Sequence, residues 1–416
     1  MATVKPFRGL RPDPGLAAKI AALPYDVMDS EEARRITADN PLSFLRVTKS
    51  EVDLPAEADH YSPAVYDQAR ATLESFVAQG YLRQDGAPCY YVYKQTMGDH
   101  TQVGLVAAAS VDEYEQGIIK KHEFTRPDKE LDRVNHIAAT DAQTGAVFLT
   151  YRADRGIDAL VERCRRRTPA YDFTADDGIS HTLYVVDDAG DIAAIEEAFR
   201  QIPALYIADG HHRSAAAARV REKCRAANPG HTGEEDYNRF LVVIFPHDQV
   251  RIMDYNRVVA DLAGFAPTDF LAAVAGKFTV EEHPAGACKP DAAHTFGMYL
   301  AGRWYRLTAR PGSFDGTDPV AGLDVSILQD NLLAPLLKVG DPRTDKRINF
   351  VGGIRGMAEL ERLVDSGRYA VAFSLYPTSV EELMAIADRG AIMPPKSTWF
   401  EPKLRDAMVV HLTGCR

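Results

Sequence analysis

The chain has 416 residues, of which 46% are hydrophobic and 26% charged, and its formal net charge at pH 7 is −11. This composition is typical of a globular protein with a packed core. So acidic a chain is a poor general binder of nucleic acid, because the phosphates of nucleic acid attract Lys and Arg. We therefore expect no nucleic-acid partner.

The five cysteines are scattered and odd in number, and they show no C-x-x-C spacing. This pattern argues against a disulfide framework or a zinc ribbon and is typical of a reducing cytosol. The N-terminal residues lack the apolar core of a signal peptide, and no stretch of about 18 apolar residues exists. The sequence therefore predicts a cytoplasmic protein with no membrane span.

Apolar periodicity and turn residues predict the elements in chain order. In the first 260 residues, helices are expected from Ser30 (as N-cap) and over 63–80, 128–141, 157–167, 192–202 and 214–226. Strands are expected over 90–94, 102–111, 145–151, 182–186, 204–208, 240–245 and 250–254. The last third predicts helices over 270–278, 325–337, 357–366 and 379–387, a hairpin over 295–307 and a strand over 370–375.

Short strands and hairpins mixed with helices indicate an α+β fold rather than a doubly wound parallel sheet. We divide the chain into an N-terminal segment, 1–88, packed on a core, 89–260, and a C-terminal α+β domain, 261–416, that closes the site. No linker marks these boundaries.

The sharpest polar pattern is Asp209-Gly210-His211-His212-Arg213, which follows a buried strand and precedes a helix. Glycine permits a tight turn, and the first N–H groups of a helix attract anions. Two imidazoles, a guanidinium and the hydroxyl of Ser214 add groups that suit phosphate oxygens. Asp209 can orient a histidine, accept a proton or hold Mg²⁺. The alternative is that Asp209 caps the helix and the histidines lie on its surface.

A second pattern covers residues 119–127, in which Glu123 stands among cations. A carboxylate in such surroundings stays ionised and can act as a base. The candidates for binding a substrate here are Lys120, His122, Arg126 and, on the following helix, Arg133. A surface charge network is the alternative.

A third pattern is the proline-rich stretch 393–403, where Lys396, Ser397 and Thr398 resemble a small grip for phosphate or carboxylate. The alternative is a rigid turn that docks on the core. The usual nucleotide and hydrolase motifs are absent from the sequence. His211 and His212 are adjacent rather than four residues apart, which disfavours a zinc site.

Several motifs occur together in the order seen in one family. They are Pro24-Tyr25-Asp26-Val27, residues 40–46, Lys121-His122-Glu123, residues 208–213 and residues 393–398. On these motifs the chain resembles the domain-of-unknown-function 1015 family over nearly its whole length. The Asp-Gly-His-His-Arg element also resembles the phosphate loop of the ParB and sulfiredoxin superfamily, which includes free-serine kinases and CTP-binding partition proteins. This resemblance implies a ParB/sulfiredoxin-like core at 89–260 with a nucleotide-phosphate site at 209–213.

The chain departs from the family pattern at one place. Family members tend to carry a His-Arg pair after a later strand, whereas this sequence reads Asp254-Tyr255-Asn256-Arg257. An asparagine cannot act as a general acid or base. If that position is catalytic in the family, this chain binds without turnover or uses another substrate.

The leading hypothesis is a small-molecule kinase that transfers phosphate from ATP to a hydroxyl of a small amino acid or hydroxy acid, with free serine as the first candidate. ATP or ADP would lie on Gly210 and the helix start, with Mg²⁺ bridging the phosphates. Glu123 would be the base, by similarity of role to the glutamate proposed in serine kinases. The catalytic set is Glu123, Asp209, His211 and His212.

Two other functions stay open. One is a nucleotide-binding regulator without phosphoryl transfer, and the other is a phosphatase or hydrolase that acts through a phosphohistidine at His211 or His212. The expected partners are a nucleotide and a small substrate. The sequence leaves a homo-oligomer open.

Overall fold

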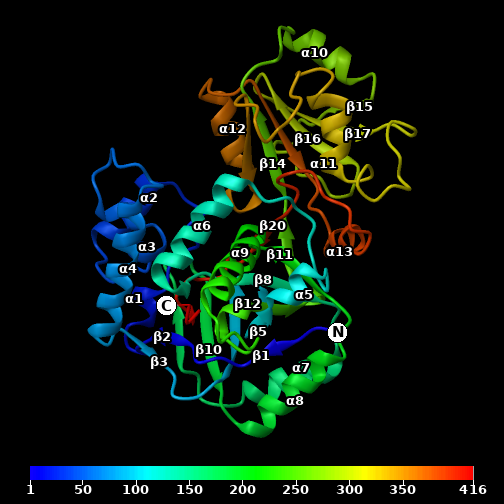
Figure 1. Ribbon diagram of the computed structural model, residues 1–416. Coiled ribbons are helices and arrows are strands. Elements are labelled where there is room, and N and C mark those ends of the chain that lie inside the picture. The colour runs from blue at the N-terminus through cyan, green and yellow to red at the C-terminus, as the bar shows by residue number, and fades with distance from the viewer. Residues whose placement is uncertain (416) are drawn as a thin grey trace. The chain divides into compact units, whose positions relative to one another are not determined.

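The computed structural model describes residues 1–415, which form two units (Figure 1). The first unit comprises Met1–Val250 together with the chain from Pro402 onward, and the second comprises Arg251–Glu401. Both units combine helices with sheets that are mixed in the first unit and antiparallel in the second, which confirms the α+β class. The division differs from the three predicted domains, because residues 1–88 share a unit with the expected core and the tail after Glu401 returns to it.

The first unit is built on a nine-stranded mixed sheet with the order β6-β11-β8-β12-β5-β4-β10-β9, and β1 pairs with β5. β11 runs antiparallel to β8, and β12 runs parallel to it. The strands are β1 (Val4–Lys5), β4 (Tyr90–Met97), β5 (His100–Ser110), β6 (Ile119–Lys120), β8 (Val147–Tyr151), β9 (Tyr171–Thr174), β10 (Ser180–Val186), β11 (Leu205–Asp209) and β12 (Arg239–Pro246).

Helices cover one face of this sheet. Apolar residues of α7 (Arg155–Cys164), α8 (Ala189–Arg200) and α9 (His211–Ala227) join the inward residues of β5, β8 and β12 in one buried cluster. A smaller cluster joins α9 to α6 (Pro127–Thr140). α9 therefore packs on its sheet side and on its α6 side, which fixes the position of its first turn.

A third cluster holds the N-terminal elements together. It includes residues of α1 (Ala17–Ile20), α2 (Ser30–Ala38), α3 (Leu45–Thr48) and α4 (Pro63–Ala78). The shorter elements of this unit are β2 (Leu10–Pro12), β3 (Leu82–Gln84), β7 (Ala142–Gln143), β21 (His411–Leu412), α5 (Val111–Glu115), η1 (Ser50–Asp53), η2 (Asp236–Asn238) and η3 (His247–Gln249).

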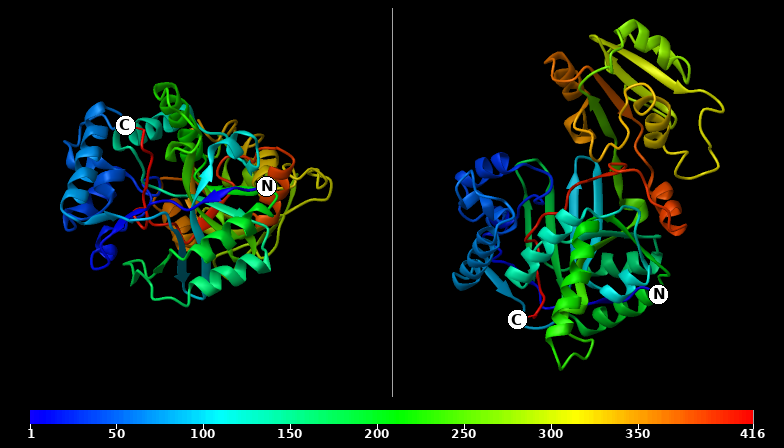
Figure 2. Two further views of the ribbon diagram at one scale, coloured as in Figure 1. Left: turned by 60° about the horizontal axis from the view of Figure 1, so that its bottom comes forward. Right: turned by 45° about the horizontal axis from the view of Figure 1, so that its top comes forward.

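The C-terminal tail is an integral part of the first unit, and Figure 2 shows it in red, running back along this unit. The side-chain amide of Gln95 donates to the carbonyl of Lys403 at 2.9 Å, and the hydroxyl of Tyr171 donates to the carbonyl of Met408 at 2.6 Å. β21 pairs with β7. These contacts, more than 200 residues apart in sequence, hold the tail along the sheet.

A disulfide joins Cys224 of α9 to Cys415 in the tail. The expectation from cysteine spacing was wrong for this pair, because 191 residues separate its members and spacing carries no signal over that distance. Cys89, Cys164 and Cys288 are free and buried. Since disulfides persist mainly in oxidising compartments, the cysteine pattern no longer supports a reducing cytosol.

The second unit contains a six-stranded sheet with the order β15-β17-β16-β19-β14-β18. Its strands are β13 (Arg251–Met253), β14 (Tyr255–Val259), β15 (Phe278–Glu282), β16 (Thr295–Leu300), β17 (Arg303–Ala309), β18 (Ile348–Gly352), β19 (Val371–Leu375) and β20 (Trp399–Glu401). Its helices are α10 (Pro267–Val274), α11 (Asp324–Leu328), η4 (Gln329–Leu333), η5 (Gly353–Arg355), α12 (Met357–Asp365) and α13 (Val380–Asp388).

Most predicted elements occur within a few residues of their expected bounds, with three corrections. Asp29 rather than Ser30 caps α2, accepting a hydrogen bond from the N–H of Glu32. α10 ends at Val274, because Phe278 already belongs to β15. The helix predicted over 325–337 continues from α11 as a short π-helix, η4. Among the helices within residues 1–415, none is both long and apolar enough to cross a membrane.

Candidate functional site

The first feature of the site is the tight connection from β11 to α9 at Gly210. Gly210 has φ +99°, in the left-handed region that favours glycine. A side chain there would place its Cβ 3.1 Å from Nε of Arg213 and 3.3 Å from Cα of Val147. α9 begins at His211, three residues earlier than predicted, so His211, His212 and Arg213 form its first turn. The first N–H groups of a helix have no partner within it and favour anions.

Asp209 does not cap the helix, since Gly210 occupies the N-cap position and no side chain caps it. The Asp209 carboxylate instead lies 3.1 Å from Nζ of Lys403 and 3.7 Å from Nη2 of Arg213. Burial alone would raise the pKa of Asp209, but Lys403 and Arg213 hold it below the ordinary range. Asp209 is therefore ionised and already paired with two cations, which makes it a poor candidate for the Mg²⁺ ligand that the sequence suggested.

Arg213 is buried and turned into the protein rather than toward a ligand. Its Nη1 donates to the carbonyl of Ala146 just before β8, and its Nη2 lies 3.9 Å from the carboxylate of Asp26. Asp406 is a further neighbour; burial, partly offset by Arg213, raises the pKa of Asp406 to about 8. The guanidinium thus connects three acidic residues of the first unit, and the prediction that it grips phosphate loses its geometric support.

The inner side of Arg213 borders a cavity of only about 30 Å³, lined also by Tyr25, Arg133, Gly145 and Val147. That volume has room for about one water.

Both histidines of the motif hold the loop that carries Glu123. Nε2 of His211 accepts the backbone N–H of His122 at 3.4 Å, and Nε2 of His212 accepts the backbone N–H of Arg126 at 3.0 Å. An imidazole that accepts at Nε2 carries its proton at Nδ1 when neutral. Burial and the neighbouring His122 lower the pKa of His211 well below its ordinary value, so this ring is neutral. Hydrogen bonds therefore connect directly two polar patterns, 119–127 and 209–213, that lie about 80 residues apart in the sequence.

Glu123 stands beside the first turn of α9. Its carboxylate oxygen lies 3.9 Å from Nδ1 of His211, and its side chain is 40% exposed. Since Nδ1 of the neutral His211 ring carries a proton, it faces the carboxylate as a donor. This combination of an accessible carboxylate, an orienting imidazole and helix N–H groups is the chemical centre of the site.

His122 lies under this centre and is not an exposed substrate contact. It is 2% exposed, its ring packs edge-on against His211 with centroids 4.4 Å apart, and burial lowers its pKa to about 4. Possible ligand atoms of His122, Glu123 and His211 lie within 4.8 Å of one another. Two imidazoles and one carboxylate suit a late first-row metal ion, whereas Mg²⁺ prefers oxygen ligands.

The other predicted residues of this half have varied surroundings. Lys120 belongs to β6, with Nζ 5.7 Å from the ring centre of Tyr206. Arg126 is exposed and pairs with Asp128 at 2.9 Å. Arg133 is nearly buried, pairs with Asp132 at 2.7 Å and stacks on the ring of Tyr25 at 3.9 Å. Lys120 and Arg126 remain accessible to a ligand, and Arg133 does not.

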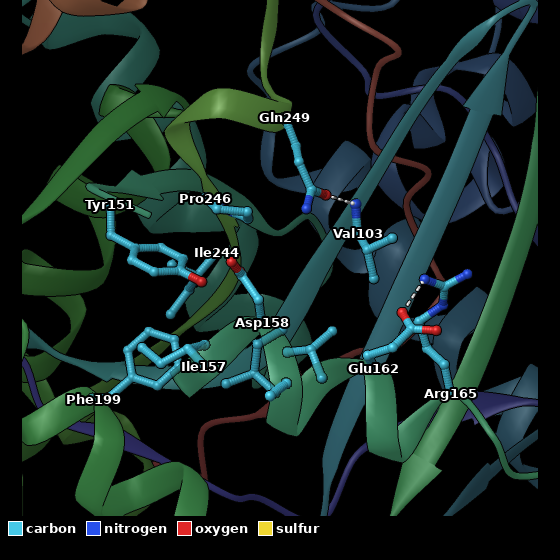
Figure 3. A pocket seen from close by; sticks show the side chains of 13 residues that line it. Val103, Tyr151, Ile157, Asp158, Glu162, Arg165, Phe199, Ile244, Pro246 and Gln249 are labelled. Atoms are coloured by element: carbon cyan, nitrogen blue, oxygen red, sulfur yellow. Dashed lines mark hydrogen bonds and ion pairs between the residues drawn. The ribbon is translucent and has the colours of Figure 1, made fainter. Parts of the chain in front are cut away.

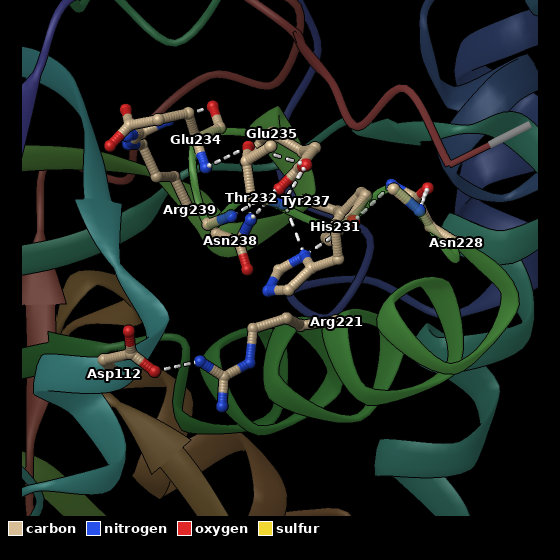
Figure 4. A network of polar contacts seen from close by, with 12 residues as sticks. Asp112, Arg221, Asn228, His231, Thr232, Glu234, Glu235, Tyr237, Asn238 and Arg239 are labelled. Carbon is tan, nitrogen blue, oxygen red and sulfur yellow. Dashed lines mark hydrogen bonds and ion pairs between the residues drawn. The ribbon is translucent and has the colours of Figure 1, made fainter.

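Ser214 is fully buried, and its hydroxyl donates to the carbonyl of Gly210 at 3.3 Å, so it does not bind phosphate as predicted. Farther along α9, Arg221 pairs with Asp112 and Glu115, the latter at 2.6 Å. Figure 4 shows Arg221 pointing from α9 toward Asp112, below the polar loop 228–239. These contacts anchor the helix whose first turn forms the site.

Lys396, Ser397 and Thr398 belong to the second unit, whereas the α9 site belongs to the first. Lys396 has φ +59°, and its carbonyl accepts from Nη2 of Arg257 at 2.9 Å. The hydroxyl of Ser397 donates to the carbonyl of Pro394 at 2.6 Å. Asn256 is buried, bonded to Asp254 and to the N–H of Leu375. The turn interpretation of 393–398 describes these contacts better than the anion grip.

Sequence reasoning missed Lys403 and Asp406 as parts of the site. Both lie in the tail, and nothing in their local pattern indicates that the tail returns to Asp209 and Arg213. Asp26 is the exception, because it was part of the Pro24-Tyr25-Asp26-Val27 motif. Its position beside Arg213 is a tertiary contact that the motif itself does not indicate.

The site of this α+β unit thus combines a strand, a glycine turn and a helix start with an accessible carboxylate. The family model described as "Protein of unknown function (DUF1015)" matches residues 4–326, and the chain belongs to this family. No curated protein matches the sequence.

Several solved structures show a weak likeness. A free serine kinase in complex with AMP is 12% identical with a TM-score of 0.36, and the match covers 71% of this chain and 87% of that one. A conserved hypothetical protein from Pyrococcus furiosus is 13% identical with a TM-score of 0.35, covering 73% and 93%. C-terminally truncated SbnI from Staphylococcus aureus is 12% identical with a TM-score of 0.36, covering 72% and 85%. TM-scores this low carry no weight for the function.

Proposed function

We propose that this protein is a small-molecule kinase that transfers the terminal phosphate of ATP to a hydroxyl group of a small amino acid or hydroxy acid, with free serine as the first candidate. The observation that carries the proposal is Glu123, a half-exposed carboxylate 3.9 Å from Nδ1 of His211 at the start of α9. A base and an anion-binding helix start side by side are what phosphoryl transfer requires.

In this proposal the phosphates lie against the first-turn N–H groups of α9, where the helix dipole favours negative charge. Glu123 takes the proton of the substrate hydroxyl while that oxygen bonds to the terminal phosphorus. The bond from phosphorus to the bridging oxygen breaks, and ADP leaves with the electron pair. His211 and His212 hold the loop that carries Glu123, and are positioning residues.

Lys120 and Arg126 are the cations that remain accessible for a substrate carboxylate. Mg²⁺ would accompany the nucleotide, since it commonly binds through phosphates with few protein ligands. The chemistry it supplies is neutralisation of phosphate charge. The ParB/sulfiredoxin-like core stays part of the proposal. Cytoplasmic location also stays part of it, although the Cys224–Cys415 disulfide argues against a reducing compartment.

The first experiment incubates the full chain with ATP, Mg²⁺ and L-serine and follows phosphoserine and ADP by ³¹P NMR. The account expects both products in equal amounts, and a panel of small hydroxy acids tests the substrate class. ADP without a phosphorylated product from any member contradicts the kinase and favours a hydrolase. No ADP at all contradicts the kinase and favours a nucleotide-binding regulator.

The role of Glu123 is tested with Glu123→Gln, which keeps the shape and removes the base. We expect kcat to fall by about 10²–10⁴-fold, the range for loss of general-base catalysis, with little change in nucleotide affinity. Glu57→Gln removes an exposed carboxylate elsewhere in the chain and is the matched control. Equal kcat values for the two variants would rule out Glu123 as the base.

A phosphohistidine mechanism is less well supported, because Nε2 of both His211 and His212 accepts a backbone N–H group. Phosphorylation at either Nε2 would break the contact that positions residues 122–126. A labelled phosphoenzyme that survives at alkaline pH would nevertheless establish it.

A further inference from the structure

The first unit contains a cavity of about 330 Å³ between the sheet and α7 (Figure 3). Apolar side chains form most of its wall, and the largest are Tyr151, Phe199, Leu105 and Ile244. The volume lies within the range of small-molecule sites. It corresponds to roughly eleven water volumes at about 30 Å³ each.

This cavity is separate from the α9 site. Arg213 contacts the carbonyl just before β8, whereas the cavity is lined by Tyr151, the last residue of that strand. Val147 and Tyr151, at the two ends of β8, are about 13 Å apart at 3.3 Å per residue. The proposal below therefore does not depend on phosphoryl transfer.

Most polar groups of the wall are bonded to each other. The carboxylate of Glu162 accepts from Arg165 at 2.6 Å, and the side-chain oxygen of Gln249 accepts the N–H of Val103 at 2.9 Å. The carboxylate of Asp158 and the hydroxyl of Tyr151 make no such bond within residues 1–415. Figure 3 shows these two groups directed toward the same part of the cavity.

The charges around that part are negative. Asp154, which caps α7, and Asp248 both act on Asp158, and burial together with these two carboxylates raises its pKa. Arg165 is the cation of the wall, and it is paired with Glu162. A ligand carboxylate or phosphate would be repelled here, whereas a cation would relieve the repulsion among the three aspartates.

We propose that this cavity binds a small amphipathic amine. Its apolar body would fill the space beside Tyr151 and Phe199, and its ammonium group would lie on Asp158 and within reach of the Tyr151 hydroxyl. A charged hydrogen bond to a partly buried carboxylate supplies the preference for an amine over a neutral or acidic ligand of the same shape.

The test uses three probes of equal chain length, hexylamine, 1-hexanol and hexanoate, with the full chain at pH 7.5. Affinities come from saturation-transfer NMR and calorimetry. We expect hexylamine to bind at least about tenfold more tightly than hexanoate, with 1-hexanol between them, since one charged contact is worth about that factor.

Two variants identify the site, and thermal unfolding checks that each is folded. Asp158→Asn should weaken hexylamine about tenfold and leave 1-hexanol unchanged, whereas Glu57→Gln, with the same change of net charge, should alter neither. Val161→Phe, from the wall of the cavity, should weaken all three probes. The proposal is overturned if no probe binds, if hexanoate binds best, if Asp158→Asn preserves the preference, or if Val161→Phe leaves every affinity unchanged.

Discussion

Two polar runs that the sequence suggested as anion-binding sites, residues 209–213 in the first unit and 396–398 in the second, have different structural roles. In the first run, Asp209 pairs with a lysine 194 residues away, and His212 bonds to a backbone group 86 residues away. In the second, Ser397 bonds to the carbonyl of Pro394, three residues away. The first run organises a whole unit, and the second closes a local turn. Residue types alone do not separate these roles, because the side chains of the first run bond to distant elements, whereas Lys396 bonds to the distant Arg257 through its backbone carbonyl.

The comparison is tested most strongly at Arg213, because the loss of this side chain should lower the free energy of unfolding more than any other change below. Arg213→Met removes the hydrogen bond to Ala146 and leaves the partly buried Asp209 with one cation fewer. Breaking a buried charge network in this way costs about 3–5 kcal/mol. Urea unfolding should therefore show a much lower midpoint with an unchanged slope. A loss below about 1 kcal/mol would mean that Arg213 does not organise the unit.

Gly210→Ala should have the next largest effect. A Cβ at φ +99° is strained and would press on Arg213 and on the backbone of Val147. Residues held in such conformations cost about 1–3 kcal/mol. Gly233→Ala, at φ +94° with open space around it, carries the conformational cost without the contacts and is the control. If the two variants lose equal stability, the close approach at Gly210 has no energetic role.

Asp406 should give the first unit a characteristic pH dependence. Its pKa is about 8 in the folded protein and about 4 when unfolded. Between these values the folded state retains a proton that the unfolded state has released, so the stability from this group falls as pH rises from about 4 to 8. Asp406→Asn should abolish that fall. The melting temperature of Asp406→Asn minus that of the original protein should rise by several degrees from pH 5 to pH 8.5, and a constant difference would contradict the account.

Lys403→Met should have a moderate effect on the free energy of unfolding. The ion pair with Asp209 is partly exposed on the Asp209 side, at 31%, which limits its contribution to about 1 kcal/mol. The more specific readout is the carboxyl resonance of Asp209 in ¹³C NMR, whose apparent pKa should increase in this variant. An unchanged titration of Asp209 would show that Lys403 does not control its charge.

Lys396→Met should have the smallest effect. The backbone carbonyl of Lys396 accepts from Arg257, so this contact survives the substitution, while the ammonium group lies 5.7 Å from the ring centre of Tyr255. We expect a change within about 0.5 kcal/mol and no change in nucleotide affinity. A loss of nucleotide binding comparable to that of a variant in the α9 turn would restore the predicted anion grip at 396–398.

The sequence was sufficient to predict the α+β class and the change from strand to helix at 209–213, because apolar periodicity and the Asp-Gly turn are local signals. It could not show that α9 begins at His211, that Arg213 points inward, or that Ser214 is buried, because these depend on the neighbouring β8. The contributions of Lys403, Asp406 and the Cys224–Cys415 disulfide depend on a tail that returns to its unit over about 200 residues. No rule based on residue spacing predicts contacts over that distance.

The most direct test of the central claim is a crystal structure of the protein with a non-hydrolysable ATP analogue. The account predicts a phosphate group within hydrogen-bond distance of the backbone N–H groups at the start of α9, with Glu123 facing the terminal phosphate. Phosphates bound elsewhere, with the first turn of α9 covered only by solvent, would contradict it.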